Sequence, residues 1–158
     1  YEIIREADEG STCWFELWAP GKFYAAQNDF AYNISPDMYR DLFLPAIEKQ
    51  SNFLTHCVYH VDGVNNFVHV DALLELPRVQ AIQIGPGAGK PSALAYMDVL
   101  KKVQNAGRNL WIDLPIDEVR PALEALSARG LYIQTSAASE DEAKELLKNA
   151  ERWSVDRG

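Results

Sequence analysis

Short apolar segments alternate with longer amphipathic segments along most of the chain. The apolar segments are four to seven residues long, are rich in aromatic and β-branched side chains, and end at turn-forming or polar residues, which is typical of β-strands. They cover residues 13–18, 53–59, 79–84, 109–114 and 131–134. Apolar side chains at helical spacing predict helices at about residues 36–51, 71–76, 92–105, 119–126 and 140–153.

Capping signals support two of these helices. Ser35 directly precedes Pro36, which places an N-cap residue before a proline at the first helical position. Ser139 is followed three residues later by Glu142, which is the spacing of a capping box. We therefore expect helices to begin at residues 36 and 140.

Five strands that alternate with five helices predict an α/β fold with a parallel sheet and right-handed crossovers. Repeating units of strand and helix form either a doubly wound sheet or a (β/α)₈ barrel, and periodicity does not separate the two. A complete barrel needs about 250 residues, whereas this chain has 158. The chain is then a fragment of a longer barrel, an open sheet, or one of two copies that complete each other.

The composition is that of one soluble globular domain over residues 1–158, since 47% of the residues are hydrophobic and 24% are charged. Fifteen basic and 23 acidic residues give a net charge of −8 without a stripe of Lys or Arg, which argues against a nucleic-acid partner. No apolar run reaches the roughly 20 residues that span a bilayer, and the first residues lack the pattern of a secretory signal. Cys13 and Cys57 lack the number and spacing of a disulfide framework. These features predict a cytoplasmic protein with no membrane partner.

Polar residues that follow the predicted strands are the first candidates for chemistry, because parallel strands bring ligands to their carboxyl ends. Asp29, His60, Asp62, Gln83 and Asp113 occupy such positions. We expect these side chains to converge on one pocket that binds a small-molecule substrate. Asp29 and Asp113 could act as general acids or bases or bind substrate nitrogen and hydroxyl groups. For Asp113, capping of the next helix is an equal alternative.

His60 and Asp62 form the most informative pair. Alternate residues of an extended segment point the same way, and an imidazole with a carboxylate can hold a divalent metal or share a proton. The alternative is structural, because Asp62–Gly63 is a turn dipeptide and a histidine at a strand end is often only hydrogen-bonded. A zinc site that adds His56 would require a bent strand. We expect His56 and His69 to be structural or to lie at the surface.

The glycine-rich loop at residues 85–90 differs from a phosphate-binding P-loop in two respects. Three residues rather than four separate Gly85 from the Gly-Lys pair, and Pro91 stands where Ser or Thr would bind magnesium. Backbone amides at Gly85 and Gly87 could still receive a carboxylate or a phosphate, and the alternative is a tight turn.

Aromatic side chains gather near the N-terminal end of the sequence. Such a group suits a wall for a flat ligand, and it equally suits packing or a buried interface. Its members are Trp14, Trp18, Phe23, Tyr24, Phe30 and Tyr32.

Several of these segments, taken in order, resemble one known superfamily. Residues 29–45, with Ile-Ser-Pro before the helix and Leu-Pro within it, resemble its loop and its helix of the pattern SP…Y…LP. Residues 60–63 resemble its next strand end. Residues 72–77, together with 82–83 and 85–87, resemble the region of the strand after that in its less characterised members, and residues 140–147 resemble its closing helix. The superfamily is that of uroporphyrinogen decarboxylase and the corrinoid (cobalamin) methyltransferases, and the resemblance covers about residues 12–153.

The resemblance implies the C-terminal part of a TIM (β/α)₈ barrel, with about five βα units in this chain and the earlier strands outside it. It implies corrinoid-linked methyl transfer from a small methylated substrate, with a corrinoid protein as acceptor. Decarboxylation of uroporphyrinogen is the alternative. A third alternative is a non-catalytic half-barrel that binds a partner or forms a homodimer, and the fragment alone is expected to be inactive.

The resemblance also implies a set of site residues. Zinc at His60 follows the zinc-dependent methyltransferase branch, in which a cysteine stands at the position of Asp62. From the strand-end positions and the resemblance together, we expect His60, Asp62 and Asp29 to be catalytic and Gln83, Gly85, Gly87 and Asp113 to bind the substrate.

Overall fold

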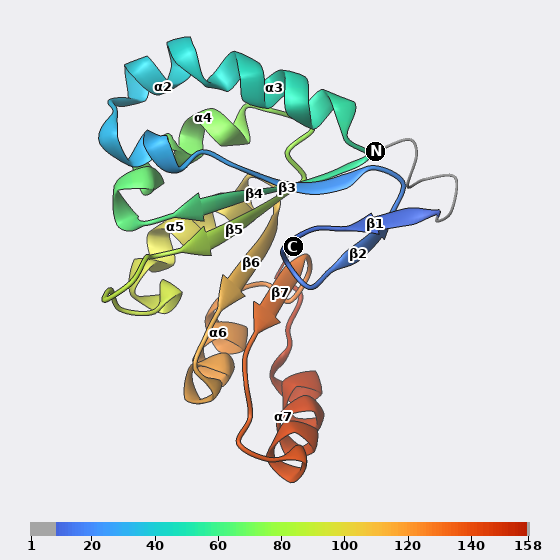
Figure 1. The fold of residues 1–158 in the computed structure, drawn as a ribbon. Coiled ribbons are helices and arrows are strands. Elements are labelled where there is room, and N and C mark those ends of the chain that lie inside the picture. The colour runs from blue at the N-terminus through green and yellow to red at the C-terminus, as the bar shows by residue number, and fades with distance from the viewer. Residues whose placement is uncertain (1–8, 158) are drawn as a thin grey trace.

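A five-stranded parallel sheet forms the centre of the computed structural model, which describes residues 9–157 (Figure 1). Its strands lie side by side in the order in which they occur in the chain. They are β3 (Phe23–Gln27), β4 (His56–Asp62), β5 (Ala81–Gly85), β6 (Asn109–Asp113) and β7 (Leu131–Gln134). The α/β class and the parallel sheet predicted from the sequence are therefore confirmed.

The expectation of a first strand at residues 13–18 was wrong. This region belongs to an antiparallel hairpin of β1 (Gly10–Thr12) and β2 (Trp18–Pro20), in which residues 13–17 form the tip. The first strand of the sheet is β3, in a segment for which the sequence predicted neither a strand nor a helix. Short alanine side chains make β3 less apolar in sequence than its neighbours, but both faces of the strand are buried at Ala25 and Ala26.

Strand β4 begins three residues later than expected, because Phe53 still belongs to the preceding helix. The strand then continues through Asp62, since its backbone stays paired with β5 up to Gly85. His60 and Asp62 consequently lie within the strand rather than beyond it.

The two predicted helix starts are confirmed at their caps. The Met38 backbone N–H donates to Ser35 Oγ over 3.2 Å, and the Glu142 N–H donates to Ser139 Oγ over 3.2 Å. The single helix expected at residues 36–51 is divided at Phe43, and Pro45 lies in the first turn of its second part. The α-helices are α2 (Pro36–Leu42), α3 (Leu44–Phe53), α4 (Val70–Leu74), α5 (Met97–Asn105), α6 (Val119–Ala125) and α7 (Glu140–Trp153). Short 3₁₀ helices precede several of them, at η1 (Asp29–Asn33), η2 (Val64–His69), η3 (Ala93–Tyr96) and η4 (Ile116–Glu118).

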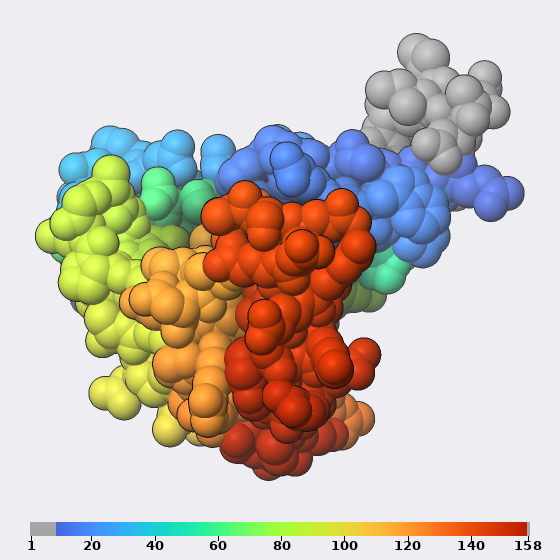
Figure 2. Space-filling view, turned by 90° about the horizontal axis from the view of Figure 1, so that it is seen from below, coloured from blue at the N-terminus to red at the C-terminus, as the bar shows by residue number. Residues whose placement is uncertain are grey.

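The two faces of the sheet pack against different elements. The larger core lies between the sheet and the helices and includes Ile82 and Ile84 of β5 and Leu100 of α5. A smaller cluster on the opposite face, which we call the inner face, joins Val58 and Trp111 to side chains of the hairpin. In the space-filling view the blue surface near the N-terminus borders an orange-red surface from the C-terminal part of the chain (Figure 2).

The strand order differs from that of a doubly wound sheet. A doubly wound sheet reverses its strand order and carries helices on both faces. Here the parallel strands follow one another from β3 to β7, so right-handed crossovers place the helices on one face. Within residues 9–157, β3 and β7 do not pair with each other, and the sheet is open. No helix in this range is long and apolar enough to cross a membrane.

Candidate functional site

A row of side chains crosses the inner face of the sheet near the carboxyl ends of its strands. Because parallel strands keep their register, side chains at paired positions project from the same face. The pairing runs from Gln27 to His60, then to Gln83, Trp111 and Tyr132. The row thus joins two residues expected at the site, His60 and Gln83, to Trp111, which sequence reasoning had treated only as part of a strand.

Three side chains at this row form a hydrogen-bonded relay. His60 Nδ1 and Gln83 Oε1 are hydrogen-bonded, and Gln83 Nε2 donates to Asp113 Oδ2 over 2.9 Å. Asp113 lies two residues beyond Trp111 on β6 and therefore projects from the same face. The relay confirms that His60, Gln83 and Asp113 come together.

The relay determines which nitrogen of His60 carries a proton. An ionised carboxylate only accepts hydrogen bonds, so Asp113 must receive the amide N–H of Gln83. The Gln83 carbonyl oxygen then faces the imidazole, and Nδ1 of His60 must donate to it. In the neutral ring the second nitrogen, Nε2, is left as the basic one.

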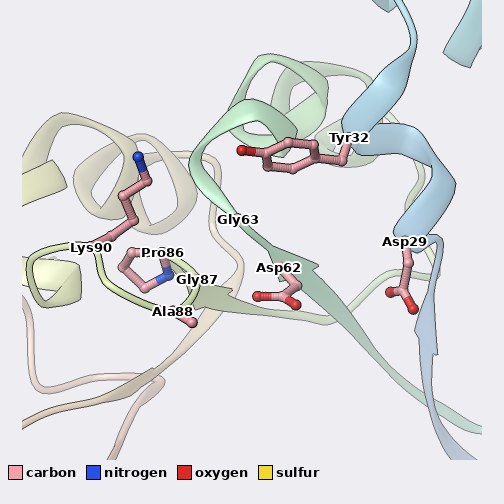
Figure 3. A pocket seen from close by; sticks show the side chains of 8 residues that line it. All are labelled: Asp29, Tyr32, Asp62, Gly63, Pro86, Gly87, Ala88 and Lys90. Atoms are coloured by element: carbon pink, nitrogen blue, oxygen red, sulfur yellow. The ribbon is translucent and has the colours of Figure 1, made fainter.

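A cavity of about 250 Å³ lies next to the relay, where β3, β4 and β5 end (Figure 3). Asp29 and Asp62 contribute carboxylates to its lining, Tyr32 contributes a ring and a hydroxyl, and Lys90 lies across the opening from Asp29. Two carboxylates against one ammonium make the lining net acidic. The five predicted polar residues therefore occupy two adjoining parts, the relay and the cavity, instead of one pocket.

Glycines shape the wall of this cavity. Gly87 has a φ of +93°, and a Cβ added there would lie 3.2 Å from the Cα of Gly63. Gly63 has a φ of +87°, and a Cβ there would lie 2.7 Å from the ring of Tyr32. Only glycine combines these backbone conformations with such close packing. The loop at residues 85–90 thus forms the cavity wall by close backbone contact.

Gly85 lies between the two parts of the site. A Cβ added at this glycine would lie 3.7 Å from His60 Cε1 and 3.6 Å from Asp62 Oδ1. His60 and Asp62 therefore approach the same point in space, as their alternation along β4 predicted.

The arrangement does not provide a three-ligand zinc site. Among residues 9–157 no group of three or more His, Cys, Asp and Glu side chains is placed to hold a metal ion. His60 already uses Nδ1 in the relay, and His56 lies at the opposite end of β4. The expected zinc ligation by His60 therefore finds no supporting ligands among these residues.

A buried network behind the cavity positions η1, which carries Asp29 and Tyr32. His69 is buried, and its Nε2 donates to the carbonyl oxygen of Ala31 over 3.0 Å, which ties η2 to η1. The ring of Tyr39 stacks on His69 at 4.3 Å. The structural interpretation of His69 is thus confirmed, although this contact between segments 38 residues apart has no signal in the sequence.

The same network contains a hydrogen bond between two buried phenols. Tyr39 Oη donates to Tyr59 Oη over 2.9 Å. Burial raises the pKa of Tyr39 to about 12, and burial likewise raises the pKa of Tyr59. Both phenols therefore stay neutral at physiological pH, and they support the cavity without supplying charge.

The hairpin tip covers the relay from the inner side. The ring of Trp14 meets the His60 ring edge-on at a centroid distance of 5.0 Å. The ring of Phe15 lies 5.6 Å from His60 and 4.2 Å from Trp111. The N-terminal aromatic group expected to form a wall thus contributes two of its members to the site, Trp14 at this tip and Tyr32 in the cavity.

The fold and the site define an α/β protein with a parallel sheet, wound in one direction, that carries a histidine relay beside a net acidic cavity. Comparisons with protein-family models, with curated proteins and with solved structures found no match for this chain.

Proposed function

We propose that this chain is the C-terminal part of a (β/α)₈ barrel of the uroporphyrinogen decarboxylase and corrinoid methyltransferase superfamily, and that it takes part in methyl transfer from a small methylated substrate. The sequential order of the parallel strands supports the barrel, because the strands of a closed (β/α)₈ barrel also follow one another in chain order with the helices on one face. The open edges at β3 and β7 are where the remaining strands would join. The observation that carries the activity is the His60–Gln83–Asp113 relay.

The role that the relay supports for His60 is proton delivery. A methyl group leaves a nitrogen, oxygen or sulfur atom more readily when that atom receives a proton as the bond breaks. In the protonated imidazole, Nδ1–H stays bound to the Gln83 carbonyl while Nε2–H is directed to the leaving atom. The acceptor that the superfamily uses, a corrinoid, would supply the nucleophile for the methyl group.

The charge of the cavity favours methyl transfer over tetrapyrrole decarboxylation. Decarboxylation also needs a proton, and His60 could deliver it. Uroporphyrinogen carries many carboxylates, however, and Asp29 and Asp62 would repel them while Lys90 offers a single cation. A neutral or cationic methylated substrate would not be repelled by the carboxylates of Asp29 and Asp62, and it therefore fits this cavity better than uroporphyrinogen does.

The test compares substitutions of two histidines of β4, His60 and His56, in the full-length protein. Methylated amines, thiols and aryl ethers are supplied with reduced cobalamin, and methyl transfer is followed by the change in visible absorption. His60→Gln should lower turnover by about a hundredfold or more, which is the usual contribution of a general acid. His56→Gln, on the same face of β4 but at its other end, should leave turnover unchanged.

Three results would contradict the proposal. Equal turnover in His60→Gln and the unchanged protein would remove His60 from the reaction. Release of carbon dioxide from uroporphyrinogen, with no methyl transfer from any substrate, would favour the decarboxylase. If neither reaction occurs and the protein sediments as a dimer, the non-catalytic half-barrel becomes the better explanation.

A further inference from the structure

Trp111 has a buried hydrogen-bond donor without an acceptor. The residue is only 3% exposed, and its indole Nε1 finds no hydrogen-bond partner among residues 9–157. Buried tryptophan N–H groups usually find an acceptor, and an unsatisfied one costs free energy. This N–H lies on the inner face one strand from Gln83, within the row that contains His60.

The ring of Phe15 packs against the Trp111 ring on the inner face. It lies 4.2 Å from the Trp111 ring and 5.6 Å from the His60 ring, so it spans the row above Gln83. Phenylalanine has no atom that can accept the indole hydrogen bond. A flat ring of similar size that carried an oxygen acceptor would keep these ring contacts and also satisfy Trp111.

The tip that carries Phe15 is attached to the sheet mainly by side chains. Residues 13–17 lie outside the regular strands of the hairpin, and Phe15 is itself only partly buried. Withdrawal of this tip would open the inner face while β1 and β2 remain paired.

We propose that Phe15 occupies a binding site for a flat ring bearing an oxygen acceptor, and that Trp111 Nε1 donates to that oxygen when the ring replaces Phe15. This inference rests on the proposed function in one respect, namely that His60 delivers a proton to the substrate, which requires part of the substrate to lie beside the His60 ring. It assigns the substrate class as an oxygen-substituted ring, and it assigns Trp111 as a specificity-determining residue.

The test uses two probes of nearly equal shape, methoxybenzene and ethylbenzene, of which only the first has an oxygen acceptor. Phe15→Ala vacates the site. Both probes should bind this variant about tenfold or more tighter than the unchanged chain, because the Phe15 ring no longer has to leave its apolar contacts before a probe can bind. Phe15→Leu, which keeps an apolar side chain in place, should show a smaller gain.

The contribution of Trp111 is measured in the Phe15→Ala background. Methoxybenzene should shift the NMR signal of the Trp111 indole N–H downfield, whereas ethylbenzene should not. Adding Trp111→Phe, which keeps a ring but removes the donor, should lower the ratio of methoxybenzene to ethylbenzene affinity by roughly three- to tenfold, the value of one neutral hydrogen bond.

Three results would overturn the inference. They are equal probe affinities in Phe15→Ala and the unchanged chain, an unmoved Trp111 signal, and an affinity ratio that Trp111→Phe leaves the same. The NMR signal needs no Trp111 variant, so it decides the matter even if Trp111→Phe does not fold. Binding to His60→Gln separates this inference from the proposed function, because ring binding should persist there although turnover is lost.

Discussion

The proton arrangement of the relay can be tested by removing its central residue. Gln83 is 3% exposed and connects His60 to Asp113, so Gln83→Leu replaces two polar contacts with an apolar side chain of similar size. His60 Nδ1–H then loses its acceptor in a half-buried position, whereas the exposed Asp113 regains water. The free-energy cost of Gln83→Leu therefore comes from the unsatisfied His60 N–H alone.

The magnitude follows from that single unsatisfied donor. Leaving a buried donor without an acceptor costs about 1–3 kcal/mol, and partial access to water places this case near the lower end. We expect the free energy of unfolding to fall by about 1–2 kcal/mol, which lowers the melting temperature by roughly 2–8 °C in a chain of this size.

Long-range ¹H–¹⁵N NMR of the imidazoles provides the decisive assay, because it distinguishes the two neutral tautomers. His60 should carry its proton on Nδ1, while His69, which donates from Nε2 to Ala31, should show the opposite tautomer in the same spectrum. In Gln83→Leu the Nδ1–H preference of His60 should be lost and His69 should not change.

A second glutamine supplies the matched control. Gln80 accepts from the Cys57 N–H and donates to the Thr55 carbonyl oxygen, at the far end of the same sheet. Gln80→Leu should lower stability without changing the His60 tautomer. An Nε2–H tautomer of His60 in the unchanged chain, or an unaltered tautomer in Gln83→Leu, would refute the reasoning about the relay.

Three further predictions concern stability, thiol reactivity and space in the site. Because burial raises the pKa of Tyr39 to about 12 from 10.0, the folded state holds this proton more tightly than the unfolded state. The free energy of unfolding should then decrease as the pH rises from 10 towards 12, by up to about 2–3 kcal/mol from this group, and Tyr39→Phe should make the decrease shallower in denaturant titrations. Burial also raises the pKa of the Cys57 thiol to about 11, so a chromogenic disulfide should label Cys13 in the native chain and Cys57 only after unfolding; rapid labelling of both would contradict this. Gly85→Ala places a methyl group between His60 and Asp62 at ordinary contact distances, so the free energy of unfolding should change little, while turnover should fall about tenfold because the methyl group displaces the substrate. Gly107→Ala is the control: its φ of +71° should lower the free energy of unfolding by about 1 kcal/mol, and turnover should not change.

Local sequence signals predicted the elements that depend on local interactions. Strand β7 has the predicted bounds, and the helices after Ser35 and Ser139 begin where their caps placed them. A cap forms its hydrogen bond within one helical turn, so the residues that determine it are adjacent in the sequence. Strand β3 was missed because its alanines give only a weak apolar signal in the sequence. They are buried because neighbouring strands and helices cover both faces of the strand.

The candidate site was predictable in its members but not in its arrangement. Alternation along β4 placed His60 and Asp62 on one face, and the topological rule for parallel sheets pointed to Gln83 and Asp113 as well. The sequence did not predict Trp111 as a site residue, because only the register between β5 and β6 brings it next to Gln83.

The sequence by itself determined the α/β class, the alternation of strands and helices, and the polar residues at the strand ends, because these depend on side-chain periodicity and on nearby hydrogen bonds. The tertiary structure alone decided the winding direction of the sheet, the division of the polar residues between relay and cavity, and the position of Phe15 above the row. Those features depend on contacts between segments far apart in the chain, such as Phe15 with Trp111 and His69 with Ala31, and no local pattern encodes such pairs.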